Sequence, residues 1–207
     1  MTLDRYQHVA LNLQGDDPRT LIMLHGTGGT AEDFARLGAM IAPEAAVLSL
    51  AGNVDENGMA RFFRRTGEGV YDMDDLARRT HELDAFLEAV LAKHGRDPAK
   101  AIGIGYSNGA NILANLLFTN PARLGAYALM HPLIPFTPAP NAALAESQVL
   151  ITAGAHDPIC PPALTDGLID WLQSQGSTVE QLVHRGGHEL RQEEIDRLAV
   201  WIAKPEA

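Results

Sequence analysis

The stretch GIGYSNGANILANLLF, residues 103–118, changes from an apolar run to a helical pattern across one serine, Ser107. The serine stands between Gly105 and Gly109 in the pattern G-x-S-x-G. Glycines on both sides of a serine, where a strand ends and a helix begins, indicate a tight turn that tolerates little side-chain bulk. Such a turn lifts the serine oxygen clear of the sheet, so the stretch predicts a strand–turn–helix unit that presents Ser107.

Strand-like runs alternate with helical patterns along nearly the whole chain. The strand-like runs lie at about 6–12, 20–25, 46–50, 100–106, 125–130, 148–153 and 178–184. Helical patterns cover about 31–42, 74–94, 162–175 and 190–203, besides the one after Ser107. Inner runs such as LIMLH and VLITAG are continuously apolar, as strands covered on both faces are. We therefore expect an α/β fold with a mostly parallel, doubly wound sheet of about seven strands.

Length, composition and charge narrow the class of protein. The chain has 207 residues, 46% of them hydrophobic, and a formal net charge of −10. We expect one globular domain over residues 1–207. The acidic charge argues against nucleic acid as a partner, because phosphate binding needs a basic surface. We find no signal-peptide pattern, no apolar run of about 20 residues and only one cysteine, Cys160, and so expect a cytoplasmic protein without a membrane anchor.

A serine hydroxyl needs a base to become a nucleophile, and the base needs a group that orients it. In a doubly wound sheet these groups lie on loops after later strands, in the chain order serine, acid, histidine. The loop AHDPICP follows the strand VLITAG and offers Asp157. The loop HRGGHEL follows the strand VEQLV and offers His188 behind two glycines. We therefore expect Ser107, Asp157 and His188 to form a catalytic triad.

Other acids and histidines fit these roles less well. Asp166 falls one turn into a predicted helix, and His184 ends its strand, where a histidine is more often a packed or capping group. His131 follows the strand AYALM and is expected to line the site. A zinc cluster of His156, His184, His188 and Cys160 would lack the short paired spacing of structural zinc sites. We expect neither a metal nor a cofactor.

Acyl transfer also needs donors for the oxyanion that develops in the transition state. The segment LIMLHGTGGT, residues 21–30, places glycine-rich backbone between a core strand and a helix. The N–H groups of Thr27, in this segment, and of Asn108, after the serine, are the expected oxyanion hole. The segment lacks the lysine of a phosphate-binding loop.

Five segments together resemble the phospholipase/carboxylesterase family of α/β-hydrolases, the small bacterial esterases. They are LHGTGG (24–29), GNVDENGMARFFRR (52–65), GYSNGA (105–110), AGAHDPICP (153–161) and GGHEL (186–190), and they span almost the full chain. The resemblance implies an α/β-hydrolase fold and cofactor-free hydrolysis of short acyl esters by a Ser-Asp-His triad. Carried over to this chain, it assigns the nucleophile to Ser107, the acid to Asp157, the base to His188 and the oxyanion hole to Thr27 and Asn108.

Two loops are expected to shape the substrate site. Residues 131–147 are short and proline-rich, so we expect no separate lid domain and a small, soluble ester as substrate. Residues 51–73 are long enough to overhang the site and hold Arg61, Phe62, Arg64 and Arg65. The arginines could bind a substrate carboxylate, or they could pair with nearby acidic residues and anchor the loop. Candidate substrate contacts are thus Arg61, Phe62, Arg64 and His131.

These features favour a serine carboxylesterase that works through an acyl-enzyme intermediate. A thioesterase or a lactone hydrolase would use the same triad. A binding module on an inactive hydrolase fold is a further alternative, against which the triad spacing argues. The sequence leaves open whether the protein forms a homodimer.

Overall fold

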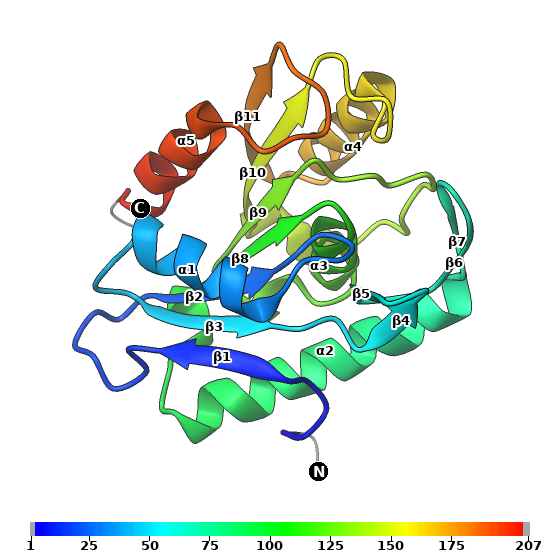
Figure 1. Ribbon diagram of the computed structural model, residues 1–207. Coiled ribbons are helices and arrows are strands. Elements are labelled where there is room, and N and C mark those ends of the chain that lie inside the picture. Colours follow the sequence, from blue (N-terminus) through cyan, green and yellow to red (C-terminus); the bar gives the residue numbers. More distant parts are fainter. Residues whose placement is uncertain (1–2, 205–207) are drawn as a thin grey trace.

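A seven-stranded sheet forms the centre of the structure, a computed structural model that describes residues 3–204 (Figure 1). Its strand order is β1-β3-β2-β8-β9-β10-β11. β1 pairs antiparallel with β3, and the remaining neighbours are parallel. The strands are β1 (His8–Leu11), β2 (Thr20–Leu24), β3 (Ala46–Leu50), β8 (Ala101–Tyr106), β9 (Ala126–Met130), β10 (Gln148–Gly154) and β11 (Thr178–His184). The predicted sheet, with its first strand at an edge, is confirmed.

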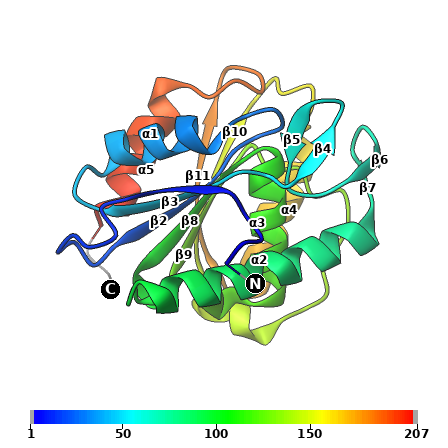
Figure 2. The same ribbon diagram turned by 60° about the horizontal axis from the view of Figure 1, so that its bottom comes forward.

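Helices cover both faces of this sheet, as Figure 2 shows. The helices α1 (Ala31–Ile41) and α5 (Gln192–Ile202) lie on one face, and α2 (Met73–Lys93), α3 (Asn108–Thr119) and α4 (Pro162–Ser174) lie on the other. Successive residues of a strand point to opposite faces, so Leu21 and Met23 pack toward α1 and α5, whereas Ile22 and Leu24 pack toward α2 and α3. This double burial explains why the inner strands are continuously apolar.

Local signals in the sequence fix where α1 and α2 begin. Thr30 caps α1, because its side chain accepts a hydrogen bond from the N–H of Asp33. Asp72 caps α2, because its side chain accepts the N–H of Asp75. In the described part of the chain, three short 3₁₀ turns complete the helical elements: η1 (Pro98–Lys100), η2 (Pro121–Arg123) and η3 (Ala142–Glu146). Within residues 3–204, no helix is both long and apolar enough to cross a membrane.

The loops at the carboxyl edge of the sheet carry the candidate site residues. The long segment between β3 and α2 folds into two hairpins, β4 (Val54–Glu56) with β5 (Met59–Arg61) and β6 (Arg65–Gly67) with β7 (Val70–Tyr71). These hairpins were not expected, because their strands are too short to show an alternating pattern. Residues 131–141, after β9, contain no helix or strand.

Candidate active site

Ser107 occupies a strained turn between β8 and α3. Its backbone has a φ of +51° and a ψ of −115°, a conformation that costs free energy for any residue except glycine. The turn is held because the N–H of Ser107 donates to the carbonyl of Met130 at 2.9 Å. A Cβ on Gly105 would lie 2.6 Å from the carbonyl of Gly109, and a Cβ on Gly109 would lie 2.2 Å from the carbonyl of Leu24. Both glycines are therefore needed for α3 to pack against β8 and β2.

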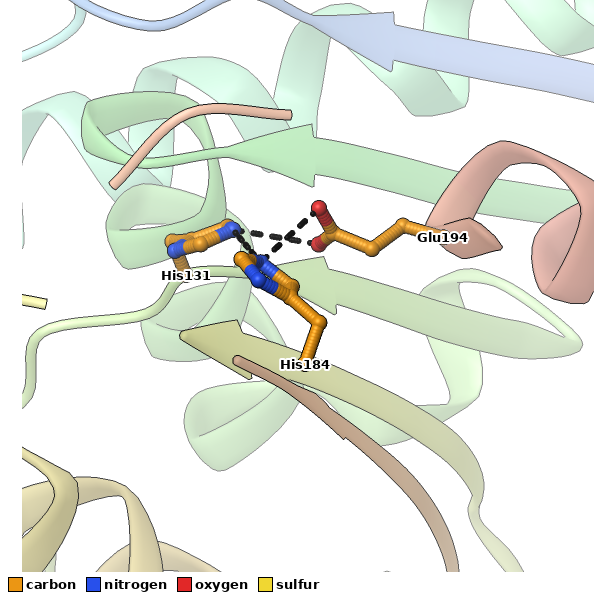
Figure 3. Close-up of side chains that lie close together, drawn as sticks. All are labelled: His131, His184 and Glu194. Atoms are coloured by element: carbon orange, nitrogen blue, oxygen red, sulfur yellow. Dashed lines mark hydrogen bonds and ion pairs between the residues drawn. The ribbon is translucent and has the colours of Figure 1, made fainter. Parts of the chain in front are cut away.

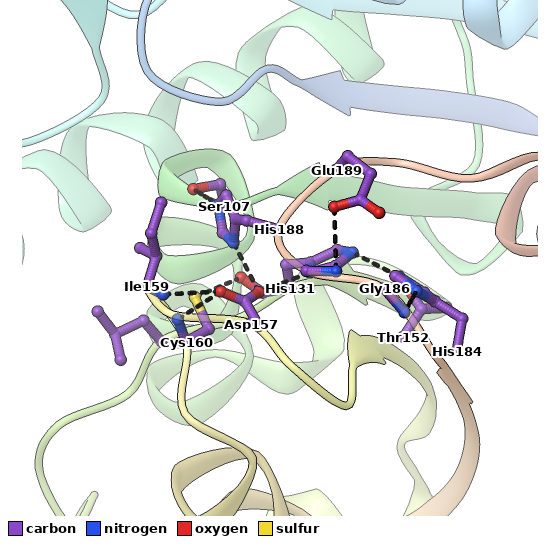
Figure 4. A network of polar contacts seen from close by, with 12 residues as sticks. Ser107, His131, Thr152, Asp157, Ile159, Cys160, His184, Gly186, His188 and Glu189 are labelled. Carbon is purple, nitrogen blue, oxygen red and sulfur yellow. Dashed lines mark hydrogen bonds and ion pairs between the residues drawn. The ribbon is translucent and has the colours of Figure 1, made fainter.

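Ser107, His188 and Asp157 form one hydrogen-bonded chain (Figure 4). Nε2 of His188 lies 2.9 Å from Oγ of Ser107, and Nδ1 of His188 lies 2.7 Å from Oδ2 of Asp157. The other oxygen of Asp157 accepts the N–H groups of Ile159 and Cys160, both at 2.8 Å. With its proton on Nδ1, the imidazole presents a free lone pair on Nε2 to the hydroxyl. The structure thus brings together the three residues that the loop order predicts.

The acid loop and the histidine loop hold each other in place. The N–H of Ala155 donates to the carbonyl of His184 at 2.8 Å, so the ladder between β10 and β11 continues past Gly154. A Cβ on Gly154 would lie 2.0 Å from the carbonyl of Gly187. The two loops can pack this closely only because the last residue of β10 has no side chain.

A buried histidine shapes the glycine-rich segment after β2. Nδ1 of His25 lies 2.6 Å from the carbonyl of Gly26, and Nε2 accepts the N–H of Gly52 at 2.9 Å. Burial lowers the pKa of His25, which favours this neutral tautomer. Arg61 donates to Oγ1 of Thr27 at 2.7 Å. These bonds fix the backbone around Thr27, and no signal in the sequence showed the part played by His25.

Two backbone N–H groups remain available beside Ser107. Among the described residues, no hydrogen bond uses the N–H of Thr27 or that of Asn108. The Asn108 side chain is held by the N–H of Phe62, which donates to its Oδ1 at 2.7 Å. Both residues line the same cavity as the serine. The two residues thus lie beside Ser107, where the sequence predicts an oxyanion hole.

A cavity of about 380 Å³ lies in front of Ser107 and His188. Its other lining residues are Thr27, Met59, Arg61, Arg65, Glu68, Gly69, Tyr71, Tyr106, Asn108, Asn111, Leu133, Ile159 and Cys160. The hydroxyl of Tyr106 donates to the carbonyl of His188 at 2.6 Å and so anchors the histidine loop at the cavity wall. Burial raises the pKa of Tyr106 to about 12, so this donor stays protonated at neutral pH.

Of the four predicted substrate contacts, only Arg61 is among the described residues that line this cavity. Phe62 is fully buried, with its ring centroid 5.0 Å from that of His25. Arg64 points to solvent and pairs with Asp72 and Asp75, each at 3.6 Å. The expectation that Phe62 and Arg64 contact substrate is therefore wrong in this structure: one is a core residue and the other anchors its loop.

His131 was predicted to line the site, but it lies behind the cavity. Its side chain is fully buried, and its Nδ1 lies 2.8 Å from Oδ2 of Asp157. On its other side Nε2 lies 3.1 Å from Oε1 of Glu194, which also binds His184 (Figure 3). His131 therefore does not line the cavity as predicted but contacts Asp157. Glu194 was not identified from the sequence, because its pattern within α5 is that of two adjacent surface glutamates.

Two groups of three side chains have the spacing of metal ligands. They are His131, His184 and Glu194, and His131, Asp157 and His188, with ligand atoms within 4.8 Å of one another. However, the N–H of Gly186 donates to Nδ1 of His184 at 2.9 Å, so neutral His184 carries its proton on Nε2. That nitrogen has no lone pair for a metal. In both groups each histidine already lies 2.7–3.1 Å from a carboxylate oxygen.

Several known proteins are similar to this chain over nearly its full length. The Bacillus subtilis protein named "Putative hydrolase MhqD" is 39% identical over 188 residues, which cover 91% of this chain and 94% of that protein. A Bacillus cereus carboxylesterase of known structure is 40% identical, with a TM-score of 0.88, and the match covers 95% of this chain and 93% of that one. Protein Atu2452 of Agrobacterium tumefaciens, described as of unknown function, is 48% identical with a TM-score of 0.90 over 98% of both chains.

No family profile matches the chain, so its membership rests on these relatives and on the shared fold. Three observations indicate the same family. They are the motifs around Ser107, Asp157 and His188, the seven-stranded sheet, and the similarity to these relatives over nearly the full length. The chain is a hydrolase that belongs to the phospholipase/carboxylesterase family of α/β-hydrolases.

Proposed function

We propose that this hydrolase is a serine carboxylesterase that cleaves small, soluble acyl esters through an acyl-enzyme intermediate. The observation that carries the proposal is the hydrogen-bonded chain from Oγ of Ser107 through His188 to Asp157 at the wall of an open cavity. A strained backbone at the serine adds support, because such strain persists where the surrounding structure enforces it and is frequent at active sites.

The geometry supports a two-step reaction. Oγ of Ser107 attacks the ester carbonyl while Nε2 of His188 takes its proton, and Asp157 stabilises the resulting imidazolium. The N–H groups of Thr27 and Asn108 donate to the oxyanion. His188 then gives the proton to the leaving alcohol, and an acyl group remains on Ser107. Water, activated by His188, attacks this acyl-enzyme and releases the carboxylic acid.

Arg61 supports a finer proposal, that the preferred esters carry a free carboxylate. Its side chain is buried at the cavity wall, where its Nη1 lies 3.6 Å from Glu56. Glu56 is closer to Arg65, to which it binds at 2.9 and 3.0 Å. Two guanidinium groups thus share one carboxylate, and the positive charge of Arg61 is only partly compensated beside the nucleophile. An acidic group on the substrate would complete this pairing.

A substrate panel tests the proposed reaction. We expect p-nitrophenyl esters of short acyl chains to be hydrolysed with a burst of about one p-nitrophenol per protein, because this good leaving group makes acylation faster than hydrolysis of the acyl-enzyme. Thioesters and lactones of matched acyl groups show whether the preference lies elsewhere. A clear preference for either would replace the esterase proposal with the corresponding hydrolase. No turnover of any of the three classes would favour a binding module.

A further inference from the structure

The acid of the proposed triad is shared by two histidines. Oδ2 of Asp157 lies 2.7 Å from Nδ1 of His188 and 2.8 Å from Nδ1 of His131. His188 borders the cavity, whereas the His131 side chain is fully enclosed on the opposite side of the carboxylate. A triad requires only the first of these contacts, so the second needs its own explanation.

Behind His131 lies a second carboxylate, on Glu194, which is fully buried (Figure 3). Its Oε1 accepts the hydroxyl of Thr152 at 2.6 Å and lies 3.1 Å from Nε2 of His131. Its Oε2 accepts the N–H of Arg191 at 2.8 Å and lies 3.1 Å from Nε2 of His184. Burial raises the pKa of Glu194, but the bonds from His131 and Thr152 outweigh it, and the net pKa is lowered. Glu194 is therefore an ionised carboxylate, and each of its oxygens accepts one hydrogen bond and has one histidine nitrogen at 3.1 Å.

The positions of the two carboxylates determine the protonation of His131. Nε2 of His131 lies 3.1 Å from Oε1 of Glu194 and 3.4 Å from Nε2 of His184, so the carboxylate oxygen is its nearer partner. A neutral ring would turn one nitrogen lone pair toward the oxygen of Asp157, at 2.8 Å, or toward that of Glu194. Only the imidazolium donates on both sides. Burial lowers the pKa of His131, but the hydrogen bonds to Glu194 and Asp157 raise it by a larger amount. The net pKa is therefore above its usual value.

We propose that His131 is a positioning residue, held as an imidazolium between Asp157 and Glu194, that keeps the triad carboxylate ionised and its Oδ2 directed at His188. This inference rests on the proposed triad. Charge then alternates along the row Glu194, His131 and Asp157, and extends to His188 when that ring takes the proton of Ser107. The protonated His131 moderates the attraction that Asp157 exerts on this proton. Glu194 is the buried counterion that makes this arrangement possible.

The groups that face His131 come from five parts of the fold. They are Tyr106 of β8, Asp157 and Cys160 after β10, His184 of β11, His188 in the following loop and Glu194 of α5. Tyr106 keeps its proton, and burial raises the pKa of Cys160, so its thiol is neutral too. The charges that act on His131 at neutral pH are thus its two carboxylates and the changing charge of His188.

Nitrogen NMR of uniformly ¹⁵N-labelled protein tests the protonation without any assay of activity. His131→Asn identifies the His131 signals, and asparagine suits this position because the backbone there has a φ of +51°. We expect both ring nitrogens of His131 to carry protons from pH 6 to pH 8. Glu194→Gln should lower the pKa of His131 by about one unit or more, since a charge at hydrogen-bond distance is removed. Glu193→Gln, on the exposed neighbour, should leave it unchanged.

Two NMR results would overturn the proposal. One is a His131 ring with a single proton at pH 7. The other is loss of the Nε2 protons of His131 and His184 on addition of zinc, which would make this cluster a metal site. Either result leaves the triad intact. Conversely, a Ser107→Ala protein that still hydrolyses esters would refute the proposed function but not the protonation of His131.

The pH profile of kcat/KM tests whether the charge of His131 acts on the triad. In His131→Asn the amide can still donate to Asp157, but the positive charge is gone. We expect the acid limb of the profile to move up by about one pH unit, with kcat on the plateau within about tenfold of wild type. His94→Asn, at the end of α2, is the matched control and should not shift it. An unshifted limb in a folded His131→Asn protein would show that His131 has only a structural role.

Discussion

Nε2 of His188 lies 2.9 Å from Oγ of Ser107, although the two residues are 81 positions apart in the chain. This distance is within the range for proton transfer between a nucleophile and its base. It results from two loops at the same sheet edge, one after β8 and one after β11.

Replacement of Asp157 by asparagine should lower kcat by several orders of magnitude. The amide would favour the wrong tautomer of His188 and would also face the donor Nδ1 of His131 with a neutral group. Steady-state hydrolysis of a p-nitrophenyl ester measures the effect. Asp166→Asn, an exposed position on α4, is the control and should retain wild-type activity. Similar rates for the two variants would remove Asp157 from the triad.

Glu194→Gln should destabilise the protein at neutral pH by about 3–5 kcal/mol, because the buried charge of His131 loses one of its two partners. The folded-state pKa of Glu194 is lowered, so its stabilising contribution is present above its unfolded pKa of about 4.3 and disappears as the pH falls through the folded value. Thermal unfolding of Glu194→Gln and wild type should therefore converge as the pH falls below about 4. A Tm difference that is independent of pH would contradict an ionised Glu194.

Gly109→Ala is expected to prevent folding or to lower the Tm strongly, since the new Cβ would lie 2.2 Å from the carbonyl of Leu24. Gly167→Ala in α4 is the matched control. A Cβ there meets nothing within 4 Å, so the substitution should stabilise the protein by about 0.5–1 kcal/mol. Circular dichroism melts compare the two. An unchanged Tm for Gly109→Ala would show that the turn can relax.

Arg61→Gln tests recognition of a substrate carboxylate. The p-nitrophenyl hemisuccinate should exceed its neutral methyl ketone analogue in kcat/KM by about ten- to a hundredfold in the wild type, since a charge-assisted hydrogen bond contributes about 1.5–3 kcal/mol. The variant should lose most of that preference. Arg64→Gln, outside the cavity, should keep it. Equal losses on both substrates in Arg61→Gln would show that Arg61 only supports the loop of Thr27.

The parts predictable from sequence are those determined by periodicity and chain order. Continuous apolar runs identified the inner strands, and loops after those strands identified Ser107, Asp157 and His188 as residues that would meet. The segment 51–73 could not be resolved in this way. Its short hairpins place Arg61 inside the cavity wall and turn Arg64 to solvent, although the two arginines are three positions apart. The contact between His131 and Glu194 depends on how α5 packs against the ends of β9 and β10, which no local pattern encodes.

Covalent labelling with a fluorophosphonate, followed by mass spectrometry of the digested protein, tests directly whether Ser107 is the nucleophile. We predict one adduct per chain, on Ser107, formed rapidly in the wild type and at least about a hundredfold more slowly in His188→Ala, because the serine then lacks its base. Ser174→Ala, an exposed serine at the end of α4, should label like the wild type. An unlabelled Ser107 in folded protein, or an adduct on another residue that abolishes hydrolysis, would contradict the assignment of Ser107 as the nucleophile.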